Sequence, residues 1–201
     1  MSAAAVEHPC AGPERTLLDD AERISALLPG HRVEIIGGQI TVTPPADMPH
    51  ADSLSDLMLP FFAAGVHGEQ TRVVQSGGVW LPDGPYDYAI PDLAVVDADY
   101  RDHLIRANCY DPAVFRLVLE VTSNNLANDL KAKVAAYAIA KIPVYVIVNR
   151  AKERIHVLTD PFANEYNHHR VYAAGERVTL PDSIGAEVTL DVAAILATGR
   201  H

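Results

Sequence analysis

The chain has 201 residues, a formal net charge of −10 and a pI near 5.2. Hydrophobic residues make up 49% of it, and this length and composition predict one domain with a packed core. The acidic balance argues against a protein that coats nucleic acid by neutralising phosphates. No apolar run approaches the roughly 18 residues of a membrane span, so no membrane partner is expected.

The N-terminal segment, 1–15, has neither the basic start nor the apolar stretch of a secretory signal. We therefore expect a flexible tail over 1–15 and a single domain over 16–201. The two cysteines, Cys10 and Cys109, match no disulfide or metal pattern, and reduced thiols in a cytoplasmic protein are the simplest interpretation.

The charge is unevenly distributed along the chain. Residues 101–154 contain nine Lys/Arg and five Asp/Glu, whereas the rest of the chain contains seven and twenty-one. A local basic face on an acidic protein and ordinary solvated surface charge both remain open.

Hydrophobic periodicity predicts the secondary structure in chain order. A short helix ends at Pro29-Gly30, a hairpin turns at Gly37-Gly38, and a second helix contains Pro60. The later elements are extended runs over 71–84, 91–97 and 114–123, a helix over 128–141, a strand over 143–150, and further extended runs over 154–160, 164–175 and 186–196, the last ending in a small helix.

The order strand, helix, strand within 115–148 indicates a crossover that joins two strands of one sheet. The early hairpin and the later strands favour antiparallel pairing. The expected fold class is therefore α/β (α+β), with a mixed central β-sheet flanked by helices, an N-terminal helix and a β-hairpin.

Two carboxylates lie on strands that are otherwise apolar. Asp92 follows Pro91 at the start of one predicted strand, and Glu120 lies inside "LVLEVTS". Because strand side chains alternate, Glu120 shares its face with Val118 and Thr122. Buried acids are rare unless they are paired or bind a metal, so this face is a candidate site.

Paired acids with a nearby lysine suit metal-assisted phosphodiester hydrolysis. The following helix offers Lys131 and Lys133, and helical geometry alone does not choose between them. The competing interpretation is structural: Glu120 could pair with Arg116 or Arg72, and the lysines could be a solvated helix face. Histidine spacing, including His168-His169, matches no zinc motif.

Three segments are "IPDLAVVD", "LVLEVTSNN" and "DLKAKVAAYAIAKIPVYVIVN". Their order and spacing resemble those of the Uma-two family of restriction-endonuclease-like proteins, a bacterial branch of the PD-(D/E)XK nuclease superfamily. The resemblance covers roughly residues 19 to 160. The family pattern falls on Pro91-Asp92, on 120–123, and on Asp129, Lys133 and Tyr137. "VEIIGGQITVTPP" is similar to the family's hairpin, although Gly37 and Gln39 stand where the family usually has acids.

The resemblance implies a restriction-endonuclease-like fold, a Mg²⁺ or Mn²⁺ cofactor and cleavage of DNA. It implies that Asp92 and Glu120 are metal ligands and that Lys133 is the catalytic lysine, displaced from the strand onto the helix. Glu34 and His50 are further candidates for the far side of the site. Gln75 is a candidate for its lining.

Three functions follow from these observations. The first is a divalent-metal-dependent DNA endonuclease, which would act as a homodimer if it cuts both strands. The second is a catalytically inactive binding or interaction module with the same fold. The third is a metal-dependent hydrolase of a small phosphodiester.

Overall fold

A computed structural model describes residues 15–122 and 126–197, and for 126–130 it describes the backbone alone. The tail expected over 1–15 thus lies outside the described residues except for Arg15, and the side chain of Asp129 lies outside them as well. The elements in order are α1 (Leu17–Leu27), β1 (Arg32–Ile36), β2 (Gln39–Thr43), α2 (Met48–Ala63), β3 (Thr71–Gln75), β4 (Gly78–Trp80), β5 (Tyr88–Ala89), β6 (Leu93–Asp97), β7 (Leu104–Arg106), β8 (Cys109–Tyr110), β9 (Phe115–Thr122), α3 (Leu126–Ile139), β10 (Val144–Asn149), β11 (Arg154–Phe162), β12 (Glu165–Ala173), β13 (Arg177–Leu180), β14 (Val188–Asp191) and α4 (Val192–Ala197).

The strands form two six-stranded sheets and one two-stranded sheet. The central sheet has the order β12-β11-β10-β9-β6-β3, and the second has the order β2-β1-β5-β4-β8-β7. Each large sheet is mixed, because β9 and β10 run parallel in the first and β4 and β8 in the second. The α/β class is confirmed, but the second six-stranded sheet was not expected, because its strands β5, β7 and β8 have only two or three residues.

The predicted crossover is present. Strand β9 leads into α3, which returns the chain to β10, and β10 pairs with β9 in parallel with Glu120 opposite Ile147. The long apolar strands explain why these elements are central: β10 is buried along its whole length, and β9 along most of it.

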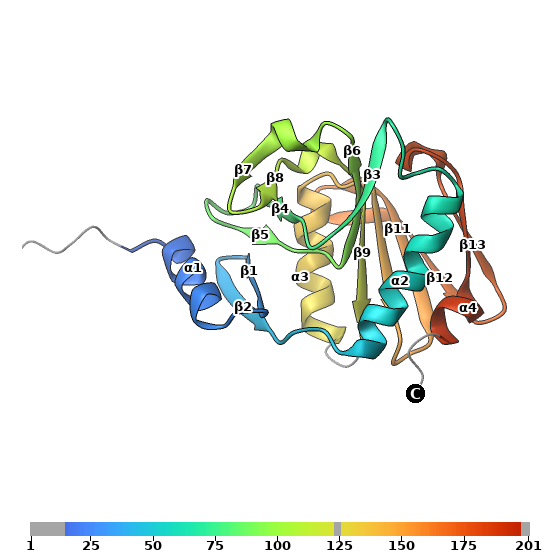
Figure 1. The fold of residues 1–201 in the computed structure, drawn as a ribbon, viewed down its shortest axis with the longest axis horizontal. Coiled ribbons are helices and arrows are strands. Elements are labelled where there is room, and N and C mark those ends of the chain that lie inside the picture. The colour runs from blue at the N-terminus through green and yellow to red at the C-terminus, as the bar shows by residue number, and fades with distance from the viewer. Residues whose placement is uncertain (1–14, 123–125, 198–201) are drawn as a thin grey trace, which may run out of the picture.

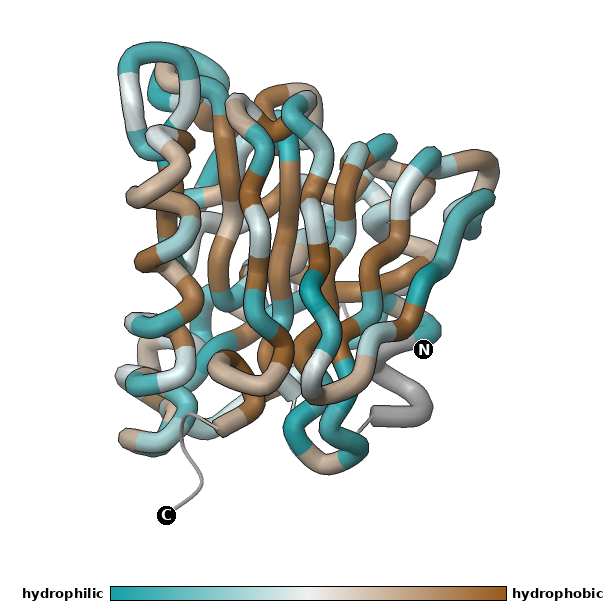
Figure 2. The backbone as a smooth tube through the Cα atoms, turned by 90° about the vertical axis from the view of Figure 1, so that its right-hand side faces the viewer, coloured by the Kyte–Doolittle hydropathy of each residue, from teal (hydrophilic) through white to brown (hydrophobic). Residues whose placement is uncertain are grey.

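Helices α2 and α3 cover opposite faces of the central sheet. Leu117 and Leu119 pack in one core cluster with Leu57 of α2. Val118 packs in the other cluster with Tyr137 of α3. Figure 1 shows α2 in front of the strands and α3 between the β1–β2 hairpin and β9, and Figure 2 shows hydrophobic residues along the strands and hydrophilic ones in many of the loops. The alternation predicted for β9 is therefore confirmed.

The β1–β2 hairpin turns at Gly37 and Gly38, as predicted, with φ angles of +59° and +69°. Two successive residues in the left-handed region suit a tight turn whose twist matches the strands, and glycine adopts it without steric cost. Helix α1 packs on this hairpin through Leu18 and Ala21. The hairpin in turn places the side chains of β1 beside the central sheet.

Candidate functional site

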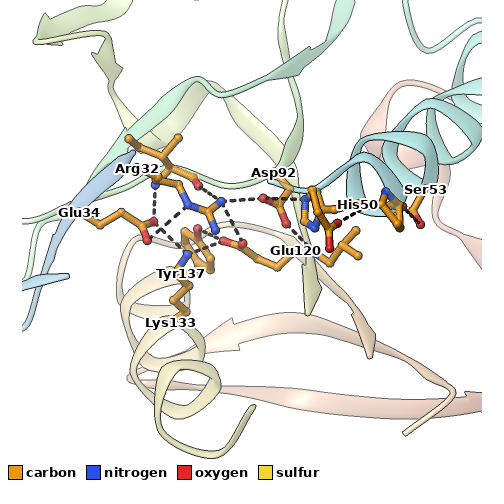
Figure 3. A network of polar contacts seen from close by, with 12 residues as sticks. Arg32, Glu34, His50, Ser53, Asp92, Glu120, Lys133 and Tyr137 are labelled. Carbon is orange, nitrogen blue, oxygen red and sulfur yellow. Dashed lines mark hydrogen bonds and ion pairs between the residues drawn. The ribbon is translucent and has the colours of Figure 1, made fainter. Parts of the chain in front are cut away.

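The site lies where β1, the start of β6, β9 and α3 meet (Figure 3). Asp92 lies directly before β6 and is 8% exposed. Its Oδ2 accepts a hydrogen bond of 2.7 Å from the backbone N–H of Val121, which ties the start of β6 to the end of β9. Its Oδ1 accepts a hydrogen bond of 2.6 Å from Arg32 and lies 3.5 Å from Nε2 of His50.

Glu120 projects from the middle of β9 toward α3. Its Oε1 accepts hydrogen bonds from Nζ of Lys133 at 2.8 Å and from the hydroxyl of Tyr137 at 3.0 Å. Lys133 and Tyr137 are four residues apart and so lie on one side of the helix. Glu120 is 4% exposed and Lys133 8% exposed, whereas Lys131 is exposed. The structure thus resolves the choice between the two lysines in favour of Lys133.

Glu34 of β1 also contacts Lys133. Its Oε1 accepts hydrogen bonds from Nζ of Lys133 at 2.9 Å and from the backbone N–H of Ile90 at 2.7 Å. Lys133 therefore joins the hairpin carboxylate to the carboxylate of the central strand. Two of the three N–H bonds of its ammonium group have these acceptors, and among the described residues no third acceptor is found.

Arg32 connects the remaining groups, and it was not among the site residues predicted from the sequence. Its Nη1 donates to Asp92 at 2.6 Å and to the carbonyl of Ile90 at 3.0 Å, and it lies 3.8 Å from Oε2 of Glu120. Its Nε lies 3.8 Å from Glu34. The available signal was its position two residues before Glu34, which places both side chains on one face of the strand.

The arginine beside Glu120 is therefore Arg32, and the expectation of Arg116 or Arg72 in that role is wrong. Arg116 pairs instead with Asp97 at 2.7 Å. Arg116 is the second residue of β9 and is exposed. It lies four residues before Glu120 along the extended strand, which is too far for the two side chains to pair.

His50 and Gln75 lie at the outer side of the site. His50 is in the first turn of α2, which begins at Met48 and is capped by the side chain of Asp47. Gln75 ends β3, and its amide lies 2.7 Å from Sδ of Met58. All five predicted site residues thus belong to one network with Arg32, and Gln75 lines the adjacent cavity.

The electrostatics follow from burial and pairing. Burial raises the pKa of Glu120 to about 7, with Lys133 opposing the shift and the nearby Asp92 adding to it. Burial also acts to raise the pKa of Asp92, but His50, Arg32 and the Val121 N–H together hold it below its usual value. The pKa of Lys133 is raised despite burial, because Glu120 and Glu34 favour its charged form.

A cavity of about 630 Å³ opens beside this network, between the hairpin, α2 and the central sheet. Arg32, His50, Asp92 and Val121 are in its wall, and Arg150 lies at its lining after β10. Glu120 and Lys133 are not among the described residues that line it. Arg32, which lines the cavity, lies 3.8 Å from Oε2 of Glu120.

Asp92 and Glu120 have the chemistry of ligands for a hard cation, since each offers carboxylate oxygens. Both approach the same cationic atom, Nη1 of Arg32, so one positive centre already lies between them. Within residues 15–122 and 126–197, no group of three or more His, Cys, Asp or Glu side chains is arranged to hold a metal ion. Mg²⁺ often uses only one or two protein carboxylates and completes its shell with water, so the residues present fit such an ion.

The architecture is that of a nuclease-like α/β fold, and the comparisons agree. A crystal structure of a "putative nuclease belonging to DUF820" from Anabaena variabilis superposes with a TM-score of 0.64 at 14% identity, over 82% of this chain and 90% of that one. The family model Uma2, described as "Putative restriction endonuclease", matches residues 18–193, so the chain belongs to this family. No curated protein matches the chain.

No helix among the described residues is long and apolar enough to span a membrane.

Proposed function

We propose that this protein is a divalent-metal-dependent endonuclease that hydrolyses phosphodiester bonds in DNA. The observation that carries the proposal is the convergence of Asp92, Glu120 and Lys133 from three separate elements on one buried network beside an open cavity. Membership in a family described as restriction endonucleases supports the same chemistry.

In this proposal Asp92 and Glu120 hold Mg²⁺ or Mn²⁺. Such an ion, when bound, lowers the pKa of a coordinated water and offsets the charge that develops on the phosphate. The Val121 N–H fixes the orientation of Asp92, and Tyr137 fixes that of Glu120. Both carboxylates are therefore positioned before any ligand arrives, which reduces the cost of assembling the site.

Lys133 would act on the attacking water. Its ammonium group is held by Glu34 and Glu120, and its third N–H remains to donate to a water molecule. A positive charge held at this point would stabilise the developing hydroxide. Glu34 would thus be a positioning residue, and His50 would help to orient Asp92 from the side of the cavity.

DNA would approach through the cavity. Arg150, which lines it, belongs to the basic segment 101–154, and its side chain is suited to phosphate contact. A homodimer would place two sites on one duplex, as a double-strand cut requires. The protein is proposed to act in the cytoplasm as a single domain over 16–201.

The test is metal-dependent cleavage of plasmid and linear duplex DNA with Mg²⁺ or Mn²⁺. Asp92→Asn and Glu120→Gln should each lower the rate by at least about 100-fold, because each removes one charged ligand. Asp97→Asn is the matched control, since Asp97 lies at the other end of the same strand and pairs with Arg116. Full activity in either site variant, with the fold intact by circular dichroism, would contradict the proposal.

A second candidate is a nuclease-fold binding module without catalysis. The observation that favours it is that each of the three buried carboxylates already contacts Arg32 or Lys133, so the network is nearly neutral without a metal. Calorimetric titration with Mn²⁺ separates the two functions. A heat of Mn²⁺ binding that is present in the wild type and lost in Asp92→Asn supports the metal site. The absence of any binding heat in the wild type supports the binding module.

A third candidate is a metal-dependent hydrolase of a small phosphodiester. The cavity of about 630 Å³ falls within the size range of small-molecule sites, which favours it. A substrate panel that includes cyclic dinucleotides and bis(p-nitrophenyl) phosphate next to duplex DNA would distinguish it, because cleavage of the small esters alone would assign the site to them.

A further inference from the structure

We infer that the guanidinium group of Arg32 occupies the cation position of the site in the metal-free protein, and that a divalent ion binds by displacing it. The inference rests on the proposed metal site and adds a residue that competes for it.

The first support is the position of Nη1. This atom lies 2.6 Å from Oδ1 of Asp92 and 3.8 Å from Oε2 of Glu120, so it bridges the two carboxylates proposed as metal ligands (Figure 3). A guanidinium group is a cation with directional donors and can hold two carboxylates in place. A divalent ion that both carboxylates bind would need the space that Nη1 occupies, so the ion and the guanidinium group exclude each other.

The second support is charge. Asp92, Glu120 and Glu34 are buried, and within the described part of the chain the lysine and arginine side chains that contact them are Lys133 and Arg32. With all three carboxylates ionised and both cations in place, the five groups sum to −1. If Arg32 stayed while a divalent ion bound, the sum would be +1 in a buried region. If its guanidinium moved out to solvent as the ion bound, the three carboxylates, Lys133 and the ion would sum to 0.

The third support is access. Lys133 is held on two sides by Glu34 and Glu120 and does not line the cavity, whereas Arg32 lines it and its side chain is 26% exposed. Arg32 therefore has space into which it can turn, and it both lines the cavity and approaches Glu120. Displacing it would both free the ligands and open Glu120 to the cavity.

The test measures metal affinity and stability, independently of cleavage. Mn²⁺ is titrated calorimetrically into the wild type, Arg32→Met and Arg106→Met. Methionine removes the charge but keeps an unbranched chain. Arg106 is the matched control, because its ion pair with Glu22 lies on the surface and contacts no site residue. We expect Arg32→Met to bind Mn²⁺ roughly tenfold or more tightly than the wild type, since a competing cation is gone. Arg106→Met should bind as the wild type does.

Thermal unfolding supplies a second measurement. Without metal, Arg32→Met should melt below the wild type, because Asp92 loses its hydrogen-bonded cation. Saturating Mn²⁺ should raise its melting temperature more than that of the wild type. Arg32→Lys, which keeps a charge but has no fork to bridge two carboxylates, should show intermediate affinity.

A measurement on the wild type covers the case in which neither variant folds. In ¹⁵N-labelled protein, the Nε–H signal of Arg32 should shift as Mg²⁺ is added, while that of Arg106 should not.

The outcomes separate the two proposals. Equal or weaker Mn²⁺ binding by Arg32→Met, or an Arg32 signal unmoved while Mg²⁺ binds, would overturn the role of Arg32 and leave the metal site standing. No Mn²⁺ binding by any of the proteins would overturn both.

Discussion

Lys133 on α3 donates a hydrogen bond of 2.8 Å to Glu120 on β9, the strand that precedes this helix. The pair forms because the crossover returns the helix across the face of the strand from which it came. Lys133 simultaneously reaches Glu34, which is 99 residues away along the chain. One side chain therefore joins the central sheet to the hairpin, and the integrity of the site depends on it.

Lys133→Met should destabilise the protein strongly. It would leave Glu120 and Glu34, which are 4% and 2% exposed, without their shared cation, and breaking a buried pair in this way costs about 3–5 kcal/mol. Urea denaturation measures the loss. Lys131→Met, two residues away on the exposed side of the same helix, should change stability by less than about 0.5 kcal/mol. Equal losses of stability in the two variants would mean that the buried contacts of Lys133 contribute no more to the free energy of unfolding than the exposed side chain of Lys131 does.

Tyr137→Phe should have a smaller effect in the same direction. The substitution removes only the hydroxyl that donates to Glu120 at 3.0 Å and keeps the ring that packs against Tyr145. Loss of one donor to a buried acid should lower the free energy of unfolding by about 1–2 kcal/mol. Tyr110→Phe is the comparison, since its hydroxyl makes a long contact of 3.4 Å on the surface. A cost for Tyr110→Phe as large as that for Tyr137→Phe would argue against this account.

Gly38→Ala should weaken the hairpin that carries Arg32 and Glu34. Gly38 has a φ of +69°, and an alanine there costs roughly 1–2 kcal/mol even though no atom lies within 4 Å of the added Cβ. Gly77→Ala is the control, because Gly77 has no positive φ and its nearest neighbour, Val74, lies at 3.9 Å. Thermal unfolding of the two variants measures the difference. A loss confined to Gly77→Ala would show that backbone conformation at the turn is unimportant.

Cys109 should be unreactive in the folded protein. It is buried, and burial raises the pKa of its thiol to about 12, so at about pH 8 almost no thiolate is present to react. In a Cys10→Ser variant, which leaves Cys109 as the single thiol, Ellman's reagent should react slowly in buffer and completely in guanidinium chloride. Rapid reaction in buffer would mean that the thiol of Cys109 is readily exposed in the folded protein and that the second sheet is not stable around β8.

The sequence by itself determined the local parts of this protein. The alternation in β9 separated Glu120 from Leu119, the Gly37-Gly38 pair marked the hairpin turn, and the strand–helix–strand order established the parallel crossover. These features are readable because side-chain period and turn chemistry depend on neighbouring residues only. The resemblance carried by the ordered motifs led to the family that residues 18–193 match.

Only the tertiary structure decided which partners the buried acids have. The choice of Lys133 over Lys131 depends on how α3 is rotated against β9, and the position of Arg32 depends on docking of the hairpin beside β6. Arg32 and Asp92 are 60 residues apart, so no local period relates them. The second sheet escaped prediction for the same reason, because strands of two or three residues are stabilised by their pairing and packing rather than by their own sequence.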